Sequence, residues 1–480
     1  MGKEFKDFNL DINVVKALEN MGYNSPTKVQ EETIGIFLSR RDLVVKSKTG
    51  SGKTASFGIP LCSMVNSQES KVQGLILVPT RELALQVQEE ISDIGRLNKV
   101  RAVAVFGKQP FHPQAQQLKQ RVHIVVGTPG RVMDHINRGT LDLTYINSVV
   151  IDEADKMLNM GFISQVEEIL DSIKGSKNLA LYSATMPEEI KKICNKYMNN
   201  PEDITIEGGV ETKSNIKEGY IVTDKDDKLF TLLDSIYAST PEACIVFCNT
   251  KDRVKEVYSF LRKKNILTAQ IHGDMMQGDR LKTMERFKNK EYKVLVATDV
   301  AARGIHIDHI SHVYNYEIPF EKESYVHRIG RTGRNGNHGE AISIITENAI
   351  KYIEDIAEYT GKDIVKIDLP SKDEILDGKE EFDKSQQKFA MKTGVEKKKV
   401  HSDVVKIHVN GGKKKKIRTL DIVGCFSNLE GVTGADIGII DIQDGHSYVD
   451  ILNGKGKDIL RKNREVTIKG KKVSISNAKK

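Results

Sequence analysis

The sequence predicts an α/β protein with two tandem, doubly wound parallel-sheet domains, followed by a small α+β domain. Short apolar runs alternate with helical segments over the first 368 residues. Such runs are typical of strands that are buried on both faces of a parallel sheet. Small and polar residues follow several of these runs directly, where ligands bind in open α/β sheets. The last 80 residues show a different order of strands and helices.

The first domain is predicted over residues 1–207. Amphipathic patterns predict helices at Asn13–Asn20 and Thr27–Leu38, before the first strand. The predicted strands are Leu43–Val45, Gly74–Val78, Val100–Phe106, His123–Val126, Val149–Ile151 and Leu179–Leu181. Their alternation with helical segments favours parallel order.

A glycine-rich loop follows the first strand and opens a helix. It consists of Ser47, Lys48, Thr49, Gly50, Ser51, Gly52, Lys53 and Thr54. Small residues let backbone N–H groups close around phosphates, Lys53 can reach the β- and γ-phosphates, and Thr54 offers a hydroxyl to Mg²⁺. Ser47 replaces the first glycine of the general phosphate-loop pattern, so a plain glycine turn is the alternative interpretation.

Three carboxylates follow the apolar run Val149–Ile151, namely Asp152, Glu153 and Asp155. One carboxylate at the end of a buried strand can hold Mg²⁺, and another can handle a proton or a water molecule. This is the acidic half of a nucleotide-hydrolysis site, and the glycine-rich loop supplies the phosphate-binding half.

Polar residues also follow the other strands of the first domain. They are Thr80, Arg81, Thr128, Arg131, Ser183 and Thr185. Each alone is more often a loop or a helix cap. Together they place threonine and arginine side chains along one sheet edge, which suits contact with a phosphate backbone.

The second domain is predicted over residues 214–368 and has no phosphate loop of its own. Its predicted strands are Lys217–Thr223, Ala243–Cys248, Thr268–Ile271, Lys293–Ala297, His312–Tyr316 and Gly339–Ile345. Arg328, Arg331 and Arg334 recur at three-residue spacing. They are either salt-bridge partners on one helix face or, as the flanking glycines favour, arginines near a ligand that act in phosphoryl transfer.

Residues 369–401 are rich in Lys, Glu, Asp and Gln and are predicted to be a charged linker, partly helical. Residues 402–480 give the order β-α-β-β-α-β of RNA-recognition folds. The predicted elements are Val404–Val409, Arg418–Phe426, Ala435–Ile442, His446–Leu452, Lys457–Leu460 and Glu465–Ile475.

The predicted sheet face of this last domain is a weak stacking platform. Tyr448 matches the aromatic consensus of RNA-recognition folds, but His446 and Ile451 replace aromatics that would stack on bases. A run of lysines in the first loop, Lys413, Lys414, Lys415 and Lys416, together with Arg418, offers another contact surface.

Charge and composition narrow the functional classes. The chain carries a formal net charge of +7, and residues 401–480, with 16 Lys and Arg against 9 Asp and Glu, account for all of it. A basic terminal segment often binds a polyanion, although it can also be a solvated tail. The longest apolar runs are too short to span a membrane. Five scattered cysteines without metal-site spacing indicate reduced thiols in the cytoplasm.

Asp152, Glu153, Ala154 and Asp155, with the other motifs in this order, resemble the DEAD-box ATP-dependent RNA helicases. The resemblance covers residues 5 to about 368. The tail is similar, less specifically, to that of the bacterial DbpA/YxiN subgroup. The resemblance implies two RecA-like domains that bind ATP, Mg²⁺ and RNA, and an RRM-like C-terminal domain.

The resemblance also implies roles for individual residues. Phe8 and Gln30 would read adenine, the glycine-rich loop from Ser47 to Thr54 would hold the phosphates, and Thr54 and Asp152 would hold Mg²⁺. The catalytic residues would be Lys53, Asp152, Glu153, Arg331 and Arg334. The RNA-binding residues of the core would be Arg81, Thr128, Arg131, Gln277, Arg280, Thr298 and Arg303. The residues that couple hydrolysis to domain closure would be Asp155, Ser183, Thr185 and His327.

Three positions depart from the family pattern. Ser47 stands where the family usually has Ala, Lys108 follows Gly107 where a Gly-Gly pair is usual, and His306 stands where an Asp contacts the ribose. We expect the first change to be tolerated. The other two put an RNA contact and a nucleotide contact in question.

We therefore expect a monomeric, cytoplasmic RNA helicase that unwinds short RNA duplexes or remodels ribonucleoprotein. The subgroup implies large-subunit (23S) ribosomal RNA and pre-ribosomal particles as partners during ribosome assembly. The alternatives are a general RNA chaperone without this specificity, a DNA helicase and a non-enzymatic RNA-binding scaffold. Phosphate release with RNA, with DNA and without nucleic acid tests the DNA helicase and the scaffold against an RNA helicase.

Overall fold

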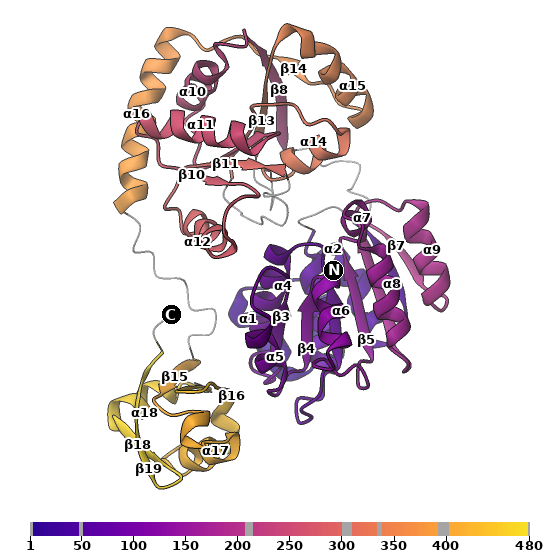
Figure 1. The fold of residues 1–480 in the computed structure, drawn as a ribbon, viewed down its shortest axis with the longest axis vertical. Helices are drawn as coiled ribbons and strands as arrows, with labels where there is room; N and C mark the ends of the chain where they lie inside the picture. Colours follow the sequence, from indigo (N-terminus) through magenta and orange to yellow (C-terminus); the bar gives the residue numbers. More distant parts are fainter. Residues whose placement is uncertain are drawn as a thin grey trace. The chain divides into compact units, whose positions relative to one another are not determined.

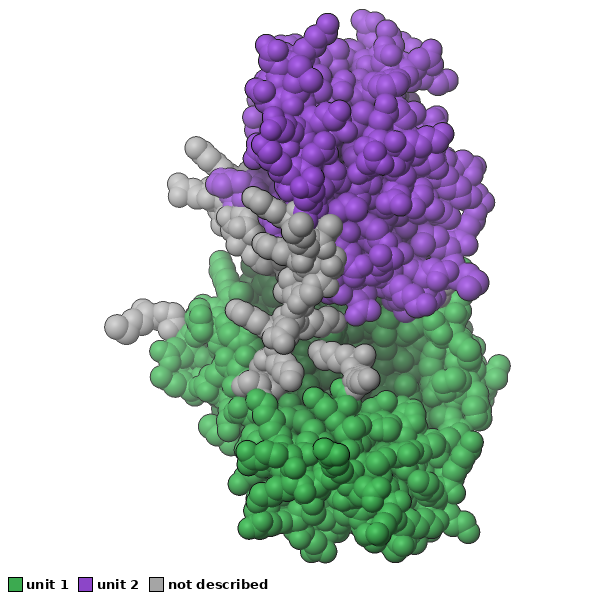
Figure 2. Space-filling view, turned by 90° about the vertical axis from the view of Figure 1, so that its left-hand side faces the viewer, with its two compact units in different colours: residues 1–207, 398–480 green, residues 208–397 purple. Residues whose placement is uncertain are grey.

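The computed structural model describes residues 3–47, 51–206, 215–299, 310–333, 338–391 and 403–478. The chain forms two compact units, residues 1–207 with 398–480, and residues 208–397 (Figure 2). Within the described ranges, no helix is both long and apolar enough to span a membrane.

The first sheet has seven parallel strands in the order β3-β4-β2-β5-β6-β1-β7 (Figure 1). The strands are β1 Leu43–Lys46, β2 Gly74–Leu77, β3 Ala102–Val105, β4 Ile124–Gly127, β5 Ser148–Asp152, β6 Asn178–Ser183 and β7 Glu202–Thr205. The helices are α1 Ile12–Met21, α2 Lys28–Leu38, α3 Lys53–Met64, α4 Arg81–Ile94, α5 Phe111–Leu118, α6 Pro129–Asn137, α7 Ala154–Asn159, α8 Ile163–Ser172 and α9 Glu188–Tyr197, with a 3₁₀ turn at Phe5–Asp7. The doubly wound prediction is confirmed, and β7 is an additional edge strand.

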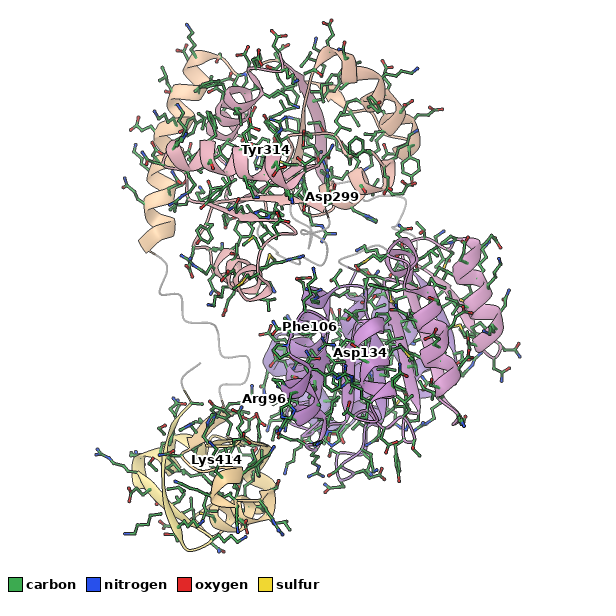
Figure 3. All side chains as sticks on the ribbon, in the orientation of Figure 1. Arg96, Phe106, Asp134, Asp299, Tyr314 and Lys414 are labelled. Carbon is green, nitrogen blue, oxygen red and sulfur yellow. The ribbon has the colours of Figure 1, made fainter. Side chains whose placement is uncertain are left out.

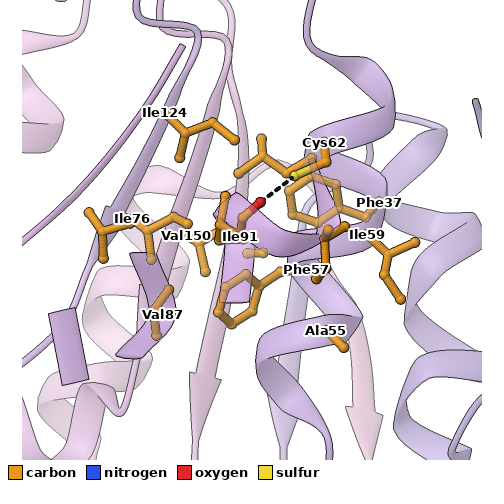
Figure 4. Close-up of a cluster of buried hydrophobic side chains, with 14 of the residues drawn as sticks. Phe37, Ala55, Phe57, Ile59, Cys62, Ile76, Val87, Ile91, Ile124 and Val150 are labelled. Carbon is orange, nitrogen blue, oxygen red and sulfur yellow. Dashed lines mark hydrogen bonds between the residues drawn. The ribbon is translucent and has the colours of Figure 1, made fainter. Parts of the chain in front are cut away.

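Helices cover both faces of this sheet because each strand is apolar on both sides. In β1, Val45 packs into one core cluster and its neighbour Val44 into the other. Figure 4 shows part of the first cluster, where Phe57 of α3 and Ile91 of α4 lie near Val150 of β5. Side chains of this size each contribute about 1.5–3 kcal/mol when fully buried.

His123, just before β4, makes the stability of this domain depend on pH. Its side chain is fully buried, and its Nδ1 accepts a hydrogen bond from the backbone N–H of Arg101 at 2.9 Å. Burial, and secondarily the charge of Arg121, lowers the pKa of His123 to about 4. The unfolded imidazole takes up a proton near pH 6.5, so stability falls as pH drops from 6.5 towards 4.

We expect His123→Gln to reduce the loss of unfolding free energy between pH 7 and pH 5. For a pKa shift of this size, the loss in the wild type totals up to about 3 kcal/mol. Urea unfolding followed by circular dichroism at pH 7 and pH 5 measures the difference. His112→Gln, at an exposed position of α5, is the matched control. Equal acid sensitivity of the wild type and His123→Gln would contradict the assignment.

The second sheet also has seven parallel strands, in the order β10-β11-β9-β12-β13-β8-β14. The strands are β8 Ile216–Val222, β9 Cys244–Cys248, β10 Thr268–Ile271, β11 Val294–Thr298, β12 His312–Asn315, β13 Gly339–Ile345 and β14 Val365–Lys366. The helices are α10 Lys228–Ser239, α11 Lys251–Lys263, α12 Gln277–Lys288, α14 Lys322–Ile329, α15 Ile350–Thr360 and α16 Lys372–Met391, with a 3₁₀ turn at Glu347–Ala349. The predicted strands are confirmed, and the two-residue β14 is added at the edge.

Helix α16 revises the linker predicted over residues 369–401. It packs against α10, and its Phe382 is fully buried in a hydrophobic cluster of the second domain. The Gln386 side chain accepts a hydrogen bond from the backbone N–H of Leu267 at 2.7 Å. A Cβ at Gly378 would lie 2.2 Å from the carbonyl oxygen of Tyr237, so a glycine is needed for this close approach. Residues 372–391 therefore belong to the second domain.

The C-terminal domain is a five-stranded antiparallel sheet in the order β16-β17-β15-β19-β18, with two helices. Its elements are β15 Val405–Val409, α17 Thr419–Ser427, β16 Ile437–Ile442, β17 Ser447–Ile451, α18 Gly456–Lys462, β18 Glu465–Ile468 and β19 Lys471–Asn477, with 3₁₀ turns at Lys413–Lys415 and Gly434–Asp436. The single final strand predicted at Glu465–Ile475 is wrong, because the chain turns back at Lys469 and Gly470. Their φ values of 52° and 73° are those of a tight two-residue hairpin turn.

Candidate active site

The candidate active site of the first domain lies at the carboxyl ends of β5, β6 and β1, which are neighbours in the sheet. The glycine-rich loop follows β1, the carboxylates follow β5, and Ser183 ends β6. Parallel strands bring these three segments to one edge although the glycine-rich loop precedes the carboxylates by about 100 residues in the sequence. The backbone N–H of Ser47 donates to the carbonyl oxygen of Ser183 at 3.0 Å and fixes the loop to β6.

Lys53 opens helix α3 and is almost fully buried. Its Nζ donates to the carbonyl oxygen of Ser47 at 3.1 Å, which bends the side chain back over the loop. Gly52 has φ of 90°, and a Cβ there would lie 2.7 Å from Nε2 of Gln30. Only glycine fits this position. Lys48, Thr49 and Gly50 lie outside the described residues.

Gln30 is held against the same loop. Its Nε2 donates to the carbonyl oxygen of Gly52 at 3.2 Å, and its Oε1 accepts from the N–H of Thr27 at 2.9 Å. The hydroxyl of Thr27 donates to the carbonyl oxygen of Ser51 at 3.0 Å. Phe8, the other residue expected at adenine, is buried in the core cluster beside α1 and α2. Gln30 therefore joins the expected adenine motif directly to the phosphate loop.

Asp152 and Glu153 stand at the end of β5 and are both buried. Burial raises the pKa of Asp152, and the ammonium of Lys53 acts in the opposite direction. In the described part of the chain, Oδ1 of Asp152 is buried and has no hydrogen-bond partner. Glu153 adopts φ of 56° and ψ of 49°, a conformation that costs a non-glycine residue about 1 kcal/mol or more.

Lys156 binds the Glu153 carboxylate, which the sequence analysis did not foresee. Its Nζ lies 2.6 Å from Oε1 of Glu153, and both side chains are buried. The pair stands three residues apart across the first turn of α7. If Glu153 activates water, one of two conditions must hold. Either Lys156 leaves the Glu153 carboxylate when substrate binds, or Lys156 keeps this carboxylate ionised until substrate binds.

The three expected coupling residues of the first domain form one hydrogen-bonded group, whereas the fourth, His327, lies on α14 of the second domain. Oδ2 of Asp155 accepts from the N–H of Thr185 at 3.1 Å and from its hydroxyl at 3.2 Å. The N–H of Asp155 donates to Oγ of Ser183 at 3.2 Å, and that hydroxyl donates to the carbonyl oxygen of Thr185 at 2.6 Å. The ends of β5 and β6 are thereby tied together, so a shift of one displaces the other.

Glu90 on α4 is a half-buried carboxyl that no sequence motif marks. It accepts a hydrogen bond from the hydroxyl of Tyr23 at 3.2 Å, and the hydroxyl of Thr54 and the charge of Asp152 also act on it. Burial raises the pKa of Glu90 to about 7. In the sequence it lies in an ordinary amphipathic helix, so only the fold places it beside the phosphate loop.

The residues expected to bind RNA in the first domain begin two helices at the same sheet edge. Arg81 opens α4 after the capping Thr80, whose Oγ1 accepts from the N–H of Leu83 at 3.2 Å. Thr128 precedes α6, in which Arg131 donates to the carbonyl oxygen of Gln109 at 3.0 Å. Lys108 adopts φ of 56°, so it keeps a backbone conformation that glycine adopts without strain.

In the second domain, Arg328 is a structural residue. Its side chain is 1% exposed, and its guanidinium binds both carboxylate oxygens of Asp299 (labelled in Figure 3), at 2.5 and 2.6 Å. Arg331 is also buried, and its Nε donates to the carbonyl oxygen of His327 at 3.0 Å. The salt-bridge interpretation is therefore correct for the first of the three arginines.

The other expected residues of this domain are only partly described. Thr298 ends β11, and Arg280 lies on α12, which Gln277 begins. Arg303, Arg334 and His306 lie outside the described residues.

Comparison with known proteins settles the family. The sequence matches DEAD/DEAH box helicase over residues 27–193, helicase conserved C-terminal domain over 224–336 and DbpA RNA binding domain over 406–477. The ATP-dependent RNA helicase DbpA of Bacillus subtilis (strain 168) is 49% identical over 476 residues, covering 99% of each chain. The chain belongs to the DEAD-box RNA helicases. It is a member of their DbpA subgroup, and its activity is ATP-dependent RNA unwinding.

Other DEAD-box helicases resemble the two-domain core. CshA of Geobacillus kaustophilus (strain HTA426) is 43% identical over 376 residues, which cover 78% of this chain and 80% of that one. Among solved structures, S. cerevisiae Dbp5 bound to RNA and ADP BeF3 is 28% identical with a TM-score of 0.70, covering 80% of this chain and all of that chain. Both of these matches support the two parallel-sheet domains.

In the C-terminal domain of this DEAD-box helicase, lysines of the 3₁₀ turn after β15 lie beside lysines of the β18–β19 hairpin. Lys414 (labelled in Figure 3) lies in the 3₁₀ turn Lys413–Lys415. Nζ of Lys471 donates to the carbonyl oxygen of Lys415 at 3.0 Å, and Nζ of Lys469 to that of Lys416 at 3.4 Å. The hairpin lysines were missed from the sequence because the β18–β19 turn was missed. We call Lys413–Lys416 with Lys469–Lys472 the basic turn pair.

Tyr448 lies on β17 directly opposite His408 of β15. The ring centroids of Tyr448 and His446 are 5.1 Å apart, and those of Tyr448 and His408 are 5.5 Å apart. The three rings form a small aromatic group on the sheet. It is narrower than the platform of an RNA-recognition fold that stacks two or three bases.

Proposed function

We propose that the C-terminal domain directs this RNA helicase to large-subunit (23S) ribosomal RNA during ribosome assembly, where the core opens short duplexes or remodels ribonucleoprotein. The observation that carries the proposal is the basic turn pair, in which the ammonium groups of Lys469 and Lys471 donate to backbone carbonyl oxygens of the lysine turn 53 and 56 residues earlier. Clustered lysines suit a folded RNA with several phosphates close in space. The DbpA subgroup, to which the chain belongs, supports ribosomal RNA as the target.

In the proposed reaction, the glycine-rich loop and Lys53 bind the phosphates of ATP, and Glu153 orients and deprotonates the attacking water. Asp155, Ser183 and Thr185 transmit the change at the γ-phosphate to the sheet edge that carries Arg81 and Thr128. Arg331 and Arg334 stabilise charge on the transferred phosphoryl group. Bending one RNA strand at that edge dislodges its partner strand.

The residues present fit Mg²⁺. This ion prefers oxygen ligands and is commonly held by one or two carboxylates together with substrate phosphates. Asp152 offers a buried carboxylate oxygen that has no hydrogen-bond partner within the described residues, and Thr54 offers a hydroxyl at the start of α3. When bound, the ion would neutralise charge on the phosphates.

We also propose that the helicase acts as a cytoplasmic monomer.

Deletion of residues 402–480 tests the targeting role. We expect the truncated protein to keep ATP hydrolysis at high concentrations of any RNA and to lose its preference for ribosomal RNA at low concentrations. The tail raises the effective concentration of the core beside its target, and tethering of this kind can exceed 10²-fold. Phosphate release is measured with a 23S ribosomal RNA fragment and with generic RNA of equal length.

Point variants locate the contact in the full-length protein. The double variant Lys469→Ala and Lys471→Ala should weaken ribosomal RNA binding. Each substitution should also lower the slope of log affinity against log salt concentration by about one. Lys457→Ala, an exposed lysine of the same domain, is the control. Tyr448→Ala should cost less than neutralising Lys413–Lys416. Equal preference for ribosomal RNA in the full-length and truncated proteins would favour a general RNA chaperone.

A further inference from the structure

A hollow of about 550 Å³ lies along the free edge of the second sheet. Strand β10 forms this edge and lies between α11 and α12 (Figure 1). Tyr258 and Arg262 of α11 line the hollow, and Thr283 and Arg286 of α12 face them. We call this hollow the β10 pocket. It belongs to neither the candidate ATP site nor the C-terminal domain.

The walls of the β10 pocket suit a nucleobase. Tyr258 and Tyr292 are both half-buried, so each presents part of a ring to solvent. The guanidinium of Arg286 lies 4.8 Å from the ring centroid of Tyr292, and Glu291 holds it there at 2.6 Å. Such rings stack on any base without regard to sequence.

Gln270 supplies a polar group to the lining of the pocket. It stands on β10, and its buried Oε1 makes no hydrogen bond within the described residues. A buried amide oxygen without a partner costs about 1–3 kcal/mol, and an incoming N–H group would relieve that cost. The exocyclic amine of a base is such a donor.

The surrounding charge favours a polyanion. Helices α11 and α12 together contain nine Lys and Arg against four Asp and Glu. Arg262 is exposed at the pocket mouth. An extended peptide could also pair with a free strand edge. The excess of cations, however, matches phosphates better than it matches a peptide of ordinary composition.

Helix α12 connects the pocket to the expected RNA contact. Arg280 stands in its first turn, and Thr283 and Arg286 follow three and six residues later. At 1.5 Å per residue they lie about 4.5 and 9 Å further along the helix. A strand that touches Arg280 can therefore continue into the pocket without a break.

We propose that the β10 pocket holds a nucleotide of the same RNA strand that contacts the first turn of α12, with its base against Tyr258. The contact extends the RNA footprint of the second domain beyond the family motifs. This inference rests on the RNA contacts that the family resemblance implies at Gln277 and Arg280.

The test uses full-length protein, a non-hydrolysable ATP analogue and single-stranded oligouridylates of increasing length, with fluorescence anisotropy as the readout. Tyr258→Ala should lower the affinity for long oligomers about tenfold and leave that for the shortest binding oligomer unchanged. Arg262→Gln, at an exposed position that does not threaten folding, should lower long-oligomer affinity severalfold. Tyr258→Phe should retain affinity, because the ring remains.

Tyr359→Ala is the matched control, since this tyrosine is 48% exposed on α15 of the same unit. RNA that carries 4-thiouridine should crosslink to peptides containing Tyr258 or Tyr292. Long-oligomer affinity unchanged in both pocket variants, with no such crosslink, would overturn the inference. A preference for 23S ribosomal RNA that is lost on deletion of residues 402–480 would then still support the proposed function, and the absence of any such preference would instead reject the proposed function.

Discussion

Glu153→Gln is expected to remove ATP turnover while ATP binding stays nearly intact. The amide has the shape of the carboxylate but cannot take a proton from water, and a general base contributes about 10²–10⁴-fold in rate. Glu153 stands in a left-handed backbone conformation beside Asp152, at the carboxyl end of a buried strand. A strained residue at this position is consistent with a functional constraint on where its side chain points.

Steady-state phosphate release and nucleotide titration measure the two effects separately. Glu168→Gln, an exposed glutamate of α8 in the same domain, controls for loss of a carboxylate elsewhere. Because Lys156 binds Glu153 at 2.6 Å, the substitution also breaks a buried ion pair, so the unfolding midpoint must be compared as well. Turnover near the wild-type level in a folded Glu153→Gln variant would remove Glu153 from the reaction.

Arg328→Met is expected to destabilise the second domain by about 3–5 kcal/mol, because it leaves Asp299 with a partly buried and uncompensated charge. The guanidinium also donates to Oδ1 of Asn249 at 2.8 Å and lies 5.2 Å from the ring centroid of Phe247. These contacts join the ends of β9, β11 and α14. Losing them disconnects three elements at the sheet edge that carries Thr298.

Urea unfolding of the full-length protein measures the loss. Arg253→Met removes the more exposed pair with Glu256 at 2.5 Å, and for such a pair we expect at most about 1 kcal/mol. A double variant with Asp299→Leu should recover part of the stability, since a buried pair can be replaced by apolar groups. A single-variant loss no larger than that of Arg253→Met would mean that Arg328 is not a structural residue.

Sequence periodicity predicted six strands of each parallel sheet, and these include the edge strands β3 and β10. Most of their residues are apolar and buried, and such runs are visible locally in the sequence. The two missed strands, β7 and β14, are edge strands, and both residues of β14 are exposed. An edge strand with polar residues on its free faces resembles a loop in the sequence.

The remaining differences arise from partners that are distant in the sequence. Phe382 and Gln386 are the buried residues of an otherwise charged helix, and α10 and β10, rather than local periodicity, determine their burial. The position of Glu90 beside the phosphate loop also depends on helix packing. In contrast, the phosphate loop and the carboxylates after β5 were predictable, because strand ends and small residues mark them directly.

Packing of α16 on the second domain also limits the length of free chain between that domain and the C-terminal domain. With residues 372–391 fixed on the second domain, only residues 392–402 separate that domain from the RNA-binding tail. Twelve Cα-to-Cα steps span at most about 40 Å in any conformation. The length of this connection therefore limits how far the helicase core can lie from an RNA element that the tail binds. Target choice becomes a question of proximity in the folded RNA as well as of what the tail recognises.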